Sequence, residues 1–163
     1  MHFSADGSRV YLRGEGVVLD AHSGAVLTTQ SVTPTRMMFG SMLRDGSTVV
    51  TRDAKLHYYD AKGATLAEIA IPVPQAMVMG QLGTSRLLLS SGGNNPADWR
   101  SFVVDLAARK VEAVTPGVRE SFTWWAESTV PQFTEDATLV VMEGGRKLVL
   151  WNPRTGEKQP FPA

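Results

Sequence analysis

The chain has 163 residues, of which 43% are hydrophobic and 20% charged, a composition typical of one ordinary globular domain. Lys and Arg number 16 and Asp and Glu number 16, so the formal net charge is zero, and nothing in the overall charge favours nucleic acid or an anionic membrane surface. The absence of cysteine excludes disulfides, thiolate chemistry and cysteine zinc sites. No apolar run approaches the roughly 20 residues that a membrane-spanning helix needs. We therefore expect neither a nucleic-acid partner nor a membrane span.

Residues 3–27 alternate between turns and short β-rich runs. Asp6-Gly7 is a tight-turn signal, because Gly accepts a positive φ and Asp hydrogen-bonds its own backbone. Short runs bounded by Gly, Asp, Ser and Pro follow along the whole chain, and none shows a 3.6-residue apolar period of helical length. The pattern predicts an all-β, antiparallel, meandering fold.

The same unit recurs along the chain. The first turn appears at four places, which are Asp6-Gly7, Asp45-Gly46, Thr84-Ser85 and Asp136-Ala137. A second turn follows each of them and ends the runs Val18-Leu19-Asp20, Tyr58-Tyr59-Asp60, Val103-Val104-Asp105 and Leu150-Trp151-Asn152. The steps from 6 to 45 and from 45 to 84 are both 39 residues, and the last step, from 84 to 136, is 52. A propeller blade occupies about 40–45 residues, so this period favours a propeller.

Two stretches resemble known propeller repeats. FSADGSRVYL…VVLDAHSGAVL resembles the repeat of bacterial YVTN-type propellers, and LVLWNPRTGEKQPF resembles the end of a WD-repeat blade. The resemblance implies a partial or small β-propeller of four antiparallel blades, in one propeller region over residues 1–163. The blades would lie at about 1–34, 35–73, 74–116 and 117–163.

The resemblance also places the strands of each blade, with the innermost strand first. The first blade would have only three strands, because too few residues precede its first turn. The expected strands are 9–13, 17–20 and 25–32; then 36–43, 48–52, 55–60 and 65–71; then 76–82, 86–90, 101–105 and 110–114; and finally 129–134, 139–143, 147–151 and 157–161. Closed propellers usually carry four to eight blades. The chain could therefore be part of a larger propeller, a homo-oligomer or hetero-oligomer that completes a ring, or a four-bladed ring.

Two insertions interrupt the regular spacing, at residues 91–99 and 116–130. Both connect strands on the same face of neighbouring blades, so they predict a recognition surface for a protein partner. Trp and Arg dominate binding hot spots. The candidate partner-binding residues are Trp99, Arg100, Arg119, Phe122, Trp124 and Trp125. The alternative is that Trp124 and Trp125 extend a strand and pack between blades.

Catalytic and metal-binding patterns are weak. The three histidines lie in different elements, and none has a second His at a metal-binding spacing. The recurring Asp residues form turns, and the methionines at 37, 38, 42, 77 and 79 fill a tapered core. We expect a non-catalytic interaction scaffold with no cofactor and no metal, which binds a protein partner or the remaining blades of a larger propeller. The alternative is the propeller domain of an enzyme, such as a lactonase-like hydrolase, a quinoprotein or an oligopeptidase.

Overall fold

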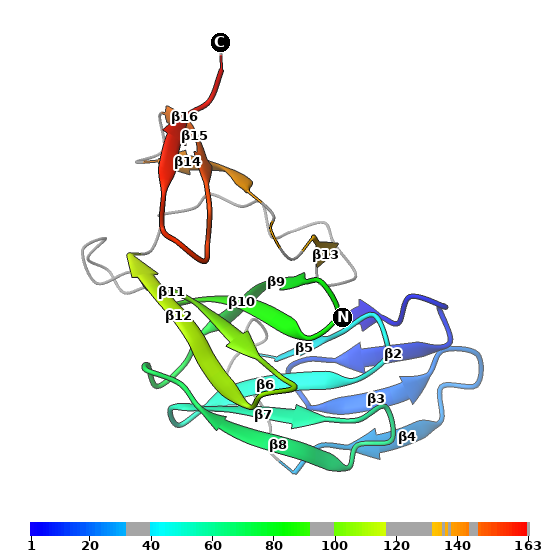
Figure 1. The fold of residues 1–163 in the computed structure, drawn as a ribbon. Coiled ribbons are helices and arrows are strands. Elements are labelled where there is room, and N and C mark those ends of the chain that lie inside the picture. Colours follow the sequence, from blue (N-terminus) through cyan, green and yellow to red (C-terminus); the bar gives the residue numbers. More distant parts are fainter. Residues whose placement is uncertain are drawn as a thin grey trace. The chain divides into compact units, whose positions relative to one another are not determined.

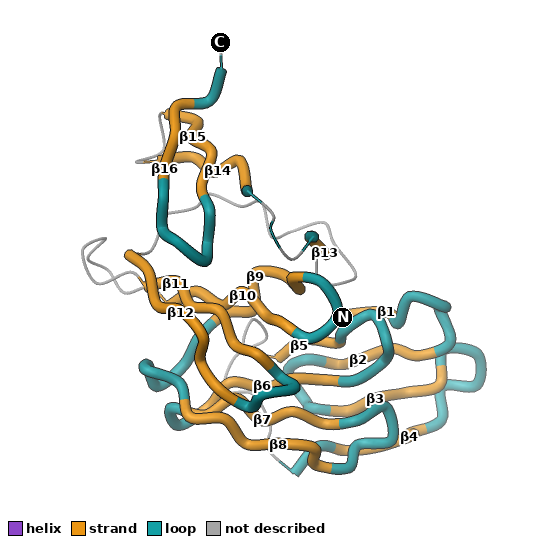
Figure 2. The backbone as a smooth tube through the Cα atoms, viewed as in Figure 1, coloured by secondary structure: helices purple, strands orange, loops and turns teal. Residues whose placement is uncertain are grey.

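The computed structural model describes residues 1–31, 40–91, 100–116, 132–134, 136, 138–143 and 147–162. These residues form an all-β structure of four sheets (Figure 1, Figure 2). Within these ranges, no helix is long and apolar enough to cross a membrane. The chain divides into two compact units, and the boundary falls between residues 78 and 79. Each unit contains two of the sheets, and the two units are described in turn.

The first sheet has the order β1-β2-β3-β4. Its strands are β1 (His2–Phe3), β2 (Arg9–Leu12), β3 (Val17–Asp20) and β4 (Val26–Thr29). The prediction of a three-stranded first blade is wrong, because His2 and Phe3 pair with Tyr11 and Val10 across the first turn. A strand of two residues is too short to show an alternating pattern. It forms because the turn, closed by the bond from the Ser4 amide to the Arg9 carbonyl at 3.1 Å, brings it back against β2.

The second sheet repeats this arrangement with the order β5-β6-β7-β8. Its strands are β5 (Gly40–Met42), β6 (Thr48–Arg52), β7 (Lys55–Tyr59) and β8 (Thr65–Ala70). The predicted strands at 48–52, 55–60 and 65–71 are confirmed to within one residue. Alternate residues of a strand face opposite sides. The burial pattern of β8 follows this rule, since Ala67 and Ile69 are buried and their neighbours are exposed.

The first and second sheets pack face to face. Tyr11 and Val18 from the first sheet form a buried cluster with Met42 from the second. A buried polar chain crosses beside this cluster: the Tyr11 hydroxyl donates to Gln30 Oε1 at 2.7 Å, and the Gln30 amide donates to the Thr48 hydroxyl. Buried polar groups need such partners, so the chain fixes how the two sheets meet.

The second unit contains the third and fourth sheets. The third has the order β12-β11-β10-β9-β13 and the fourth the order β14-β15-β16. Their strands are β9 (Met77–Leu82), β10 (Arg86–Ser91), β11 (Arg100–Asp105), β12 (Lys110–Pro116), β13 (Gln132–Phe133), β14 (Leu139–Glu143), β15 (Lys147–Trp151) and β16 (Lys158–Pro160).

The strand predicted at 129–134 joins a different sheet from the one expected. It was assigned to the fourth blade as an inner strand, but β13 pairs with β9, with Gln132 opposite Gln81 and Phe133 opposite Leu82. The pairing is parallel. The third sheet therefore has five strands and the fourth has three, so the expectation of four strands in each of these blades is wrong.

Aliphatic residues of both sheets build the core of the second unit. The third sheet contributes Leu82, Leu88 and Val103, and the fourth contributes Leu139, Val149 and Trp151. All six side chains are buried, and Met79 packs against them. This apolar cluster joins the third sheet to the fourth.

In all four sheets, the Asp or Asn at the start of the second turn accepts hydrogen bonds from backbone amides of that turn. The carboxylate of Asp20 accepts hydrogen bonds from the amides of His22 and Ser23, and that of Asp60 accepts from Lys62 and Ala64. Asp105 and Asn152 accept equivalent bonds from amides two or three residues further on. The interpretation of these residues as turn formers is confirmed, since each side chain satisfies the backbone of its own turn.

Candidate functional site

Of the predicted partner-binding residues, only Arg100 lies in the part of the chain that the structure describes. It is the first residue of β11, its side chain is exposed, and it stands opposite Ser91 on β10. The other five, Trp99, Arg119, Phe122, Trp124 and Trp125, lie outside the described residues. The recognition surface at 91–99 and 116–130 therefore stays a prediction.

Of the methionines predicted to fill the core, two pack in or against a core cluster, and Met77, the first residue of β9, is half-buried. Met42 is fully buried in the core of the first unit, and Met79 packs against the core of the second. Met37 and Met38 lie outside the described residues. Over the ranges that are described, no three His, Asp or Glu side chains gather as a metal site would require.

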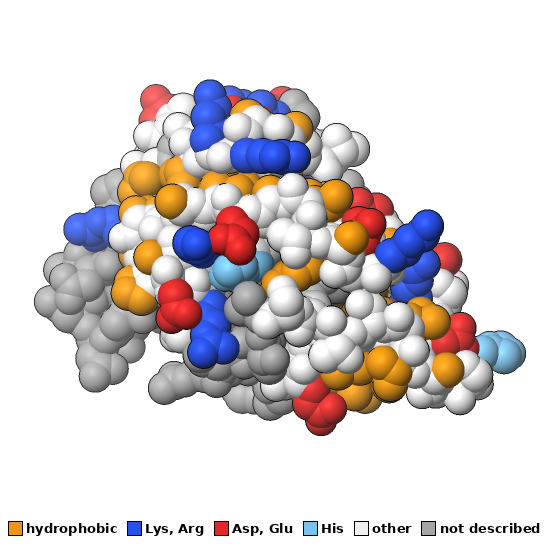
Figure 3. All heavy atoms as spheres, turned by 90° about the horizontal axis from the view of Figure 1, so that it is seen from below, with side chains coloured by type: hydrophobic (Ala, Val, Ile, Leu, Met, Phe, Trp, Pro, Cys, Tyr) orange, Lys and Arg blue, Asp and Glu red, His pale blue; other side chains and the backbone are white. Residues whose placement is uncertain are grey.

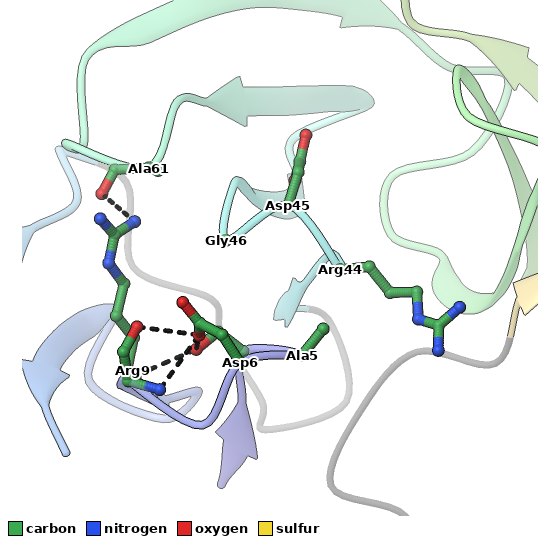
Figure 4. A pocket seen from close by; sticks show the side chains of 9 residues that line it. Ala5, Asp6, Arg9, Arg44, Asp45, Gly46 and Ala61 are labelled. Atoms are coloured by element: carbon green, nitrogen blue, oxygen red, sulfur yellow. Dashed lines mark hydrogen bonds between the residues drawn. The ribbon is translucent and has the colours of Figure 1, made fainter.

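A hollow of about 310 Å³ lies where the first turns of the first two sheets meet (Figure 4). It is lined by Ser4, Ala5, Asp6, Ser8, Arg9, Arg44, Asp45, Gly46 and Ala61. The Arg9 guanidinium crosses from one sheet to the other and donates to the Ala61 carbonyl at 3.0 Å. Asp45 accepts from the amide and hydroxyl of Ser47, at 2.9 and 2.5 Å. These polar groups are thus already engaged in holding the turns together.

The Asp6 carboxylate accepts several hydrogen bonds within its own turn. One oxygen accepts from the Ser4 hydroxyl at 2.6 Å, the Ser8 amide at 3.0 Å and the Ser8 hydroxyl at 2.8 Å. These bonds, the Ser4 hydroxyl first, lower the pKa of Asp6 to about 2. A proton-transfer group that works near neutral pH needs a pKa close to neutrality. Asp6 is instead a turn residue that is ionised at neutral pH.

A second hollow, of about 230 Å³, lies beside the β6–β7 turn. It is lined by Ser31, Arg52, Asp53, Lys55, His57 and Glu68. Lys55 and His57 project from the same side of β7, and register places Glu68 of β8 directly opposite His57. Lys55 Nζ lies 2.7 Å from Glu68 Oε2, and His57 Nδ1 lies 3.7 Å from Glu68 Oε1.

The charges in this second hollow neutralise one another. Hydrogen bonding from Lys55 lowers the pKa of Glu68, and Arg52 lies 3.4 Å from the Asp53 carboxylate. Burial lowers the pKa of His57, while the nearby Glu68 acts in the opposite direction. The imidazole is therefore neutral at pH 7, beside an ion pair that is largely exposed. Exposed pairs of this kind contribute little to stability, and the arrangement suits a sheet surface better than a reaction centre.

The face of the first sheet that is turned away from the second sheet carries an apolar row that crosses all four strands. Register aligns Phe3, Val10, Leu19 and Val26 side by side, on the face opposite to Tyr11 and Val18. Phe3 is 40% exposed and Val26 64% exposed at the ends of the row, whereas Leu19 is half-buried and Val10 is buried. We call this row the outer face. Figure 3, the view from below, shows hydrophobic side chains exposed between acidic and basic ones.

No protein-family model matches the chain, and no curated protein is significantly similar to it. The arguments about function therefore rest on the residues and their geometry.

Sequence reasoning missed both the His57–Glu68 pair and the outer face. A signal for the pair existed in the alternation of Lys55 and His57 along one strand, with Glu68 in the next. It could not be used without the register between the two strands. The outer face needed β1, whose two residues gave no pattern of their own.

Proposed function

We propose that this chain is a non-catalytic interaction domain built from β-propeller blades, and that it is part of a larger propeller or assembly. Two arrangements of strands support the propeller reading. Within each unit, the inner strands of two successive predicted blades lie against each other. In the first unit β1 contacts β5. In the second unit β9 pairs in parallel with β13, which was predicted as the inner strand of the fourth blade. The inner strands of neighbouring blades all run in one direction along a central channel, so a propeller brings them together in this way.

The observation that carries the interaction role is the outer face. The second sheet covers one side of the first sheet through Tyr11 and Val18, and on the other side Phe3 and Val26, at the two ends of the row, are exposed in the part of the chain that the structure describes. A contiguous apolar patch marks an interaction surface, whereas single exposed apolar residues do not. Sheets pack face to face about 10 Å apart, so another sheet of the same kind fits this row.

The predicted protein partner is proposed to bind elsewhere, on the face that carries residues 91–99 and 116–130. Trp99, Arg100, Arg119, Phe122, Trp124 and Trp125 would supply its contacts, with the aromatic rings as anchors. The polar groups in both hollows are engaged with their own turns and strands, which favours a binding role over catalysis in the part of the chain that is described.

The role of the outer face can be tested with Val26→Lys. At increasing concentration we expect the unmodified chain to associate with a second copy, which supplies the covering sheet, and sedimentation velocity would measure this association. A charge placed within an apolar contact should weaken it by roughly tenfold or more. Because Val26 is 64% exposed in the single chain, the substitution should hardly change the midpoint of thermal unfolding at low protein concentration.

Leu66→Lys is the matched control, because Leu66 is a similarly exposed aliphatic residue, at 40%, on β8 of the second sheet. It should leave the association unchanged. A chain that stays monomeric at every concentration, or a Val26→Lys variant that associates as strongly as the unmodified chain, contradicts the proposal.

A further inference from the structure

The packing of one sheet on the next follows the same scheme in both units. In the first unit, Val18 of the first sheet packs in one buried cluster with Met42 of the second. In the second unit, Val103 of the third sheet packs in one buried cluster with Trp151 of the fourth. We call the face that a sheet turns to the next sheet along the chain its forward face, and the opposite face its backward face. Val18 and Val103 thus lie on forward faces, and Met42 and Trp151 lie on backward faces.

The second turn of each sheet marks these two faces in the sequence. Val18 and Val103 each stand two places before the Asp that starts this turn, and both lie on a forward face. The residue one place before the turn should lie on the backward face, because alternate residues of a strand face opposite sides. Trp151 stands in that place on the fourth sheet and packs against the third. Tyr59 stands there on the second sheet, and its hydroxyl is hydrogen-bonded at 3.2 Å to that of Ser31, which follows the first sheet.

Exposed apolar side chains lie on the backward face of the first sheet and on the forward face of the fourth. The first of these is the outer face, since Leu19 stands one place before the turn and belongs to the outer row. On the fourth sheet, Leu148 and Leu150 alternate with the residues that face the third sheet, so they lie on the forward face. Phe161 lies beside Leu148, because its amide donates to the Leu148 carbonyl. Leu148 is 47% exposed and Phe161 44% exposed.

We propose that the forward face of the fourth sheet of one copy covers the outer face of a second copy, so that the chains associate head to tail. This inference rests on the proposed interaction role of the outer face and names the surface that binds there. The contact continues the forward-on-backward packing that joins the sheets of each unit. It also buries no charge, because every residue named on the two faces is apolar: Phe3, Val10, Leu19 and Val26 on one, Leu148, Leu150 and Phe161 on the other.

A head-to-tail contact differs from a symmetric one in how it assembles. Each copy offers one outer face and one fourth sheet, so a bound pair still has one free surface of each kind. Such contacts build closed rings or open chains, whereas an outer face that binds a second outer face stops at two copies. Variants that lack only one of the two surfaces therefore distinguish the two arrangements.

The test uses Val26→Lys, which alters the outer face, and Leu148→Lys, which alters the fourth sheet. In sedimentation velocity, each variant alone should associate more weakly than the unmodified chain, by about tenfold or more. An equimolar mixture should recover the association, because the Leu148→Lys copy keeps its outer face and the Val26→Lys copy keeps its fourth sheet. The recovered complex should contain two chains only, since its two remaining surfaces are both altered.

Phe161→Lys is a second variant of the fourth sheet and should behave as Leu148→Lys does, while the control Leu66→Lys should associate like the unmodified chain. Leu148 and Phe161 are exposed, so neither change should lower the midpoint of thermal unfolding at low protein concentration. The inference is overturned, and the role of the outer face stands, if Val26→Lys weakens association and both variants of the fourth sheet do not. A mixture that associates no better than its two components also overturns it. If Val26→Lys has no effect, the proposed interaction role fails as well.

Discussion

At the residue scale, the β6–β7 turn is unusual because two residues other than glycine have a positive φ. Asp53 has a φ of 53° and Ala54 a φ of 58°. Tight hairpins need this left-handed geometry, which costs a residue with a Cβ about 1–2 kcal/mol. The turn is held in place because the Ala54 amide donates to the Pro74 carbonyl at 3.0 Å and the Ala54 carbonyl accepts from the Ile71 amide at 2.9 Å.

Ala54→Gly should therefore stabilise the chain by about 0.5–1 kcal/mol, after the greater entropy of glycine in the unfolded state is allowed for. Urea denaturation measures the change. Ala67→Gly is the matched control, because Ala67 lies buried in the middle of β8, where glycine weakens a strand by about 0.5–1 kcal/mol. Equal effects of the two substitutions would show that the turn is not strained.

Asp6 predicts part of the acid sensitivity of the fold. Its pKa falls from 3.8 to about 2, chiefly because of the Ser4 hydroxyl, so ionised Asp6 favours the folded state. This contribution is complete above about pH 4 and is lost as the pH falls through about 2. In Asp6→Asn, stability should depend less on pH between 4 and 2, whereas Ser4→Ala should move the loss to a higher pH. Urea denaturation at a series of pH values tests both, and identical pH profiles for all three proteins would contradict the prediction.

At the element scale, the turn between β7 and β8 fits tightly against the first sheet. Gly63 has a φ of 84°, and a Cβ at this position would collide with the Thr28 side chain of β4. Gly24, the equivalent glycine of the first sheet, has a φ of 71° and nothing within 4 Å of such a Cβ. Substitutions at Gly24 and Gly63 therefore distinguish the cost of backbone strain, which both positions share, from the cost of a clash with the first sheet, which arises only at Gly63.

Gly24→Ala should cost about 1 kcal/mol, the price of the left-handed backbone alone. Gly63→Ala should cost about 1–3 kcal/mol more, because the added methyl group must displace Thr28 as well. Adding Thr28→Ala should recover part of that extra cost and should do nothing for Gly24→Ala. Chemical denaturation of the four variants provides the comparison, and equal costs for the two glycine substitutions would show that the sheets meet differently.

The strands show which features of a sequence can be read locally. β6 and β14 were predicted at their observed bounds, because apolar residues there lie between turn signals that set both ends. The pairing of β13 with β9 joins residues about 50 positions apart and leaves no local pattern, so it could not be predicted. The candidate site follows the same rule. Asp6 was interpreted correctly from its own turn, whereas the His57–Glu68 pair depends on the register between β7 and β8.

At the scale of the whole molecule, each compact unit has a core of its own. The cluster of Tyr11, Val18 and Met42 lies in the first unit, and the cluster around Leu88, Val103 and Trp151 lies in the second. Repeat proteins contact mainly their sequence neighbours, so their stability divides into local contributions that need not be lost together.

Leu88→Ala should therefore act on the second unit. Leu88 is 1% exposed, and truncating such a side chain costs about 2–5 kcal/mol. Hydrogen exchange should show faster exchange in β10, β11 and β15, while β2, β3 and β6 keep their protection. Val18→Ala, in the core of the first unit, should give the reverse pattern. If both substitutions lower protection equally along the whole chain, the two units unfold as one, and the local stability expected of blade-like repeats does not apply to this protein.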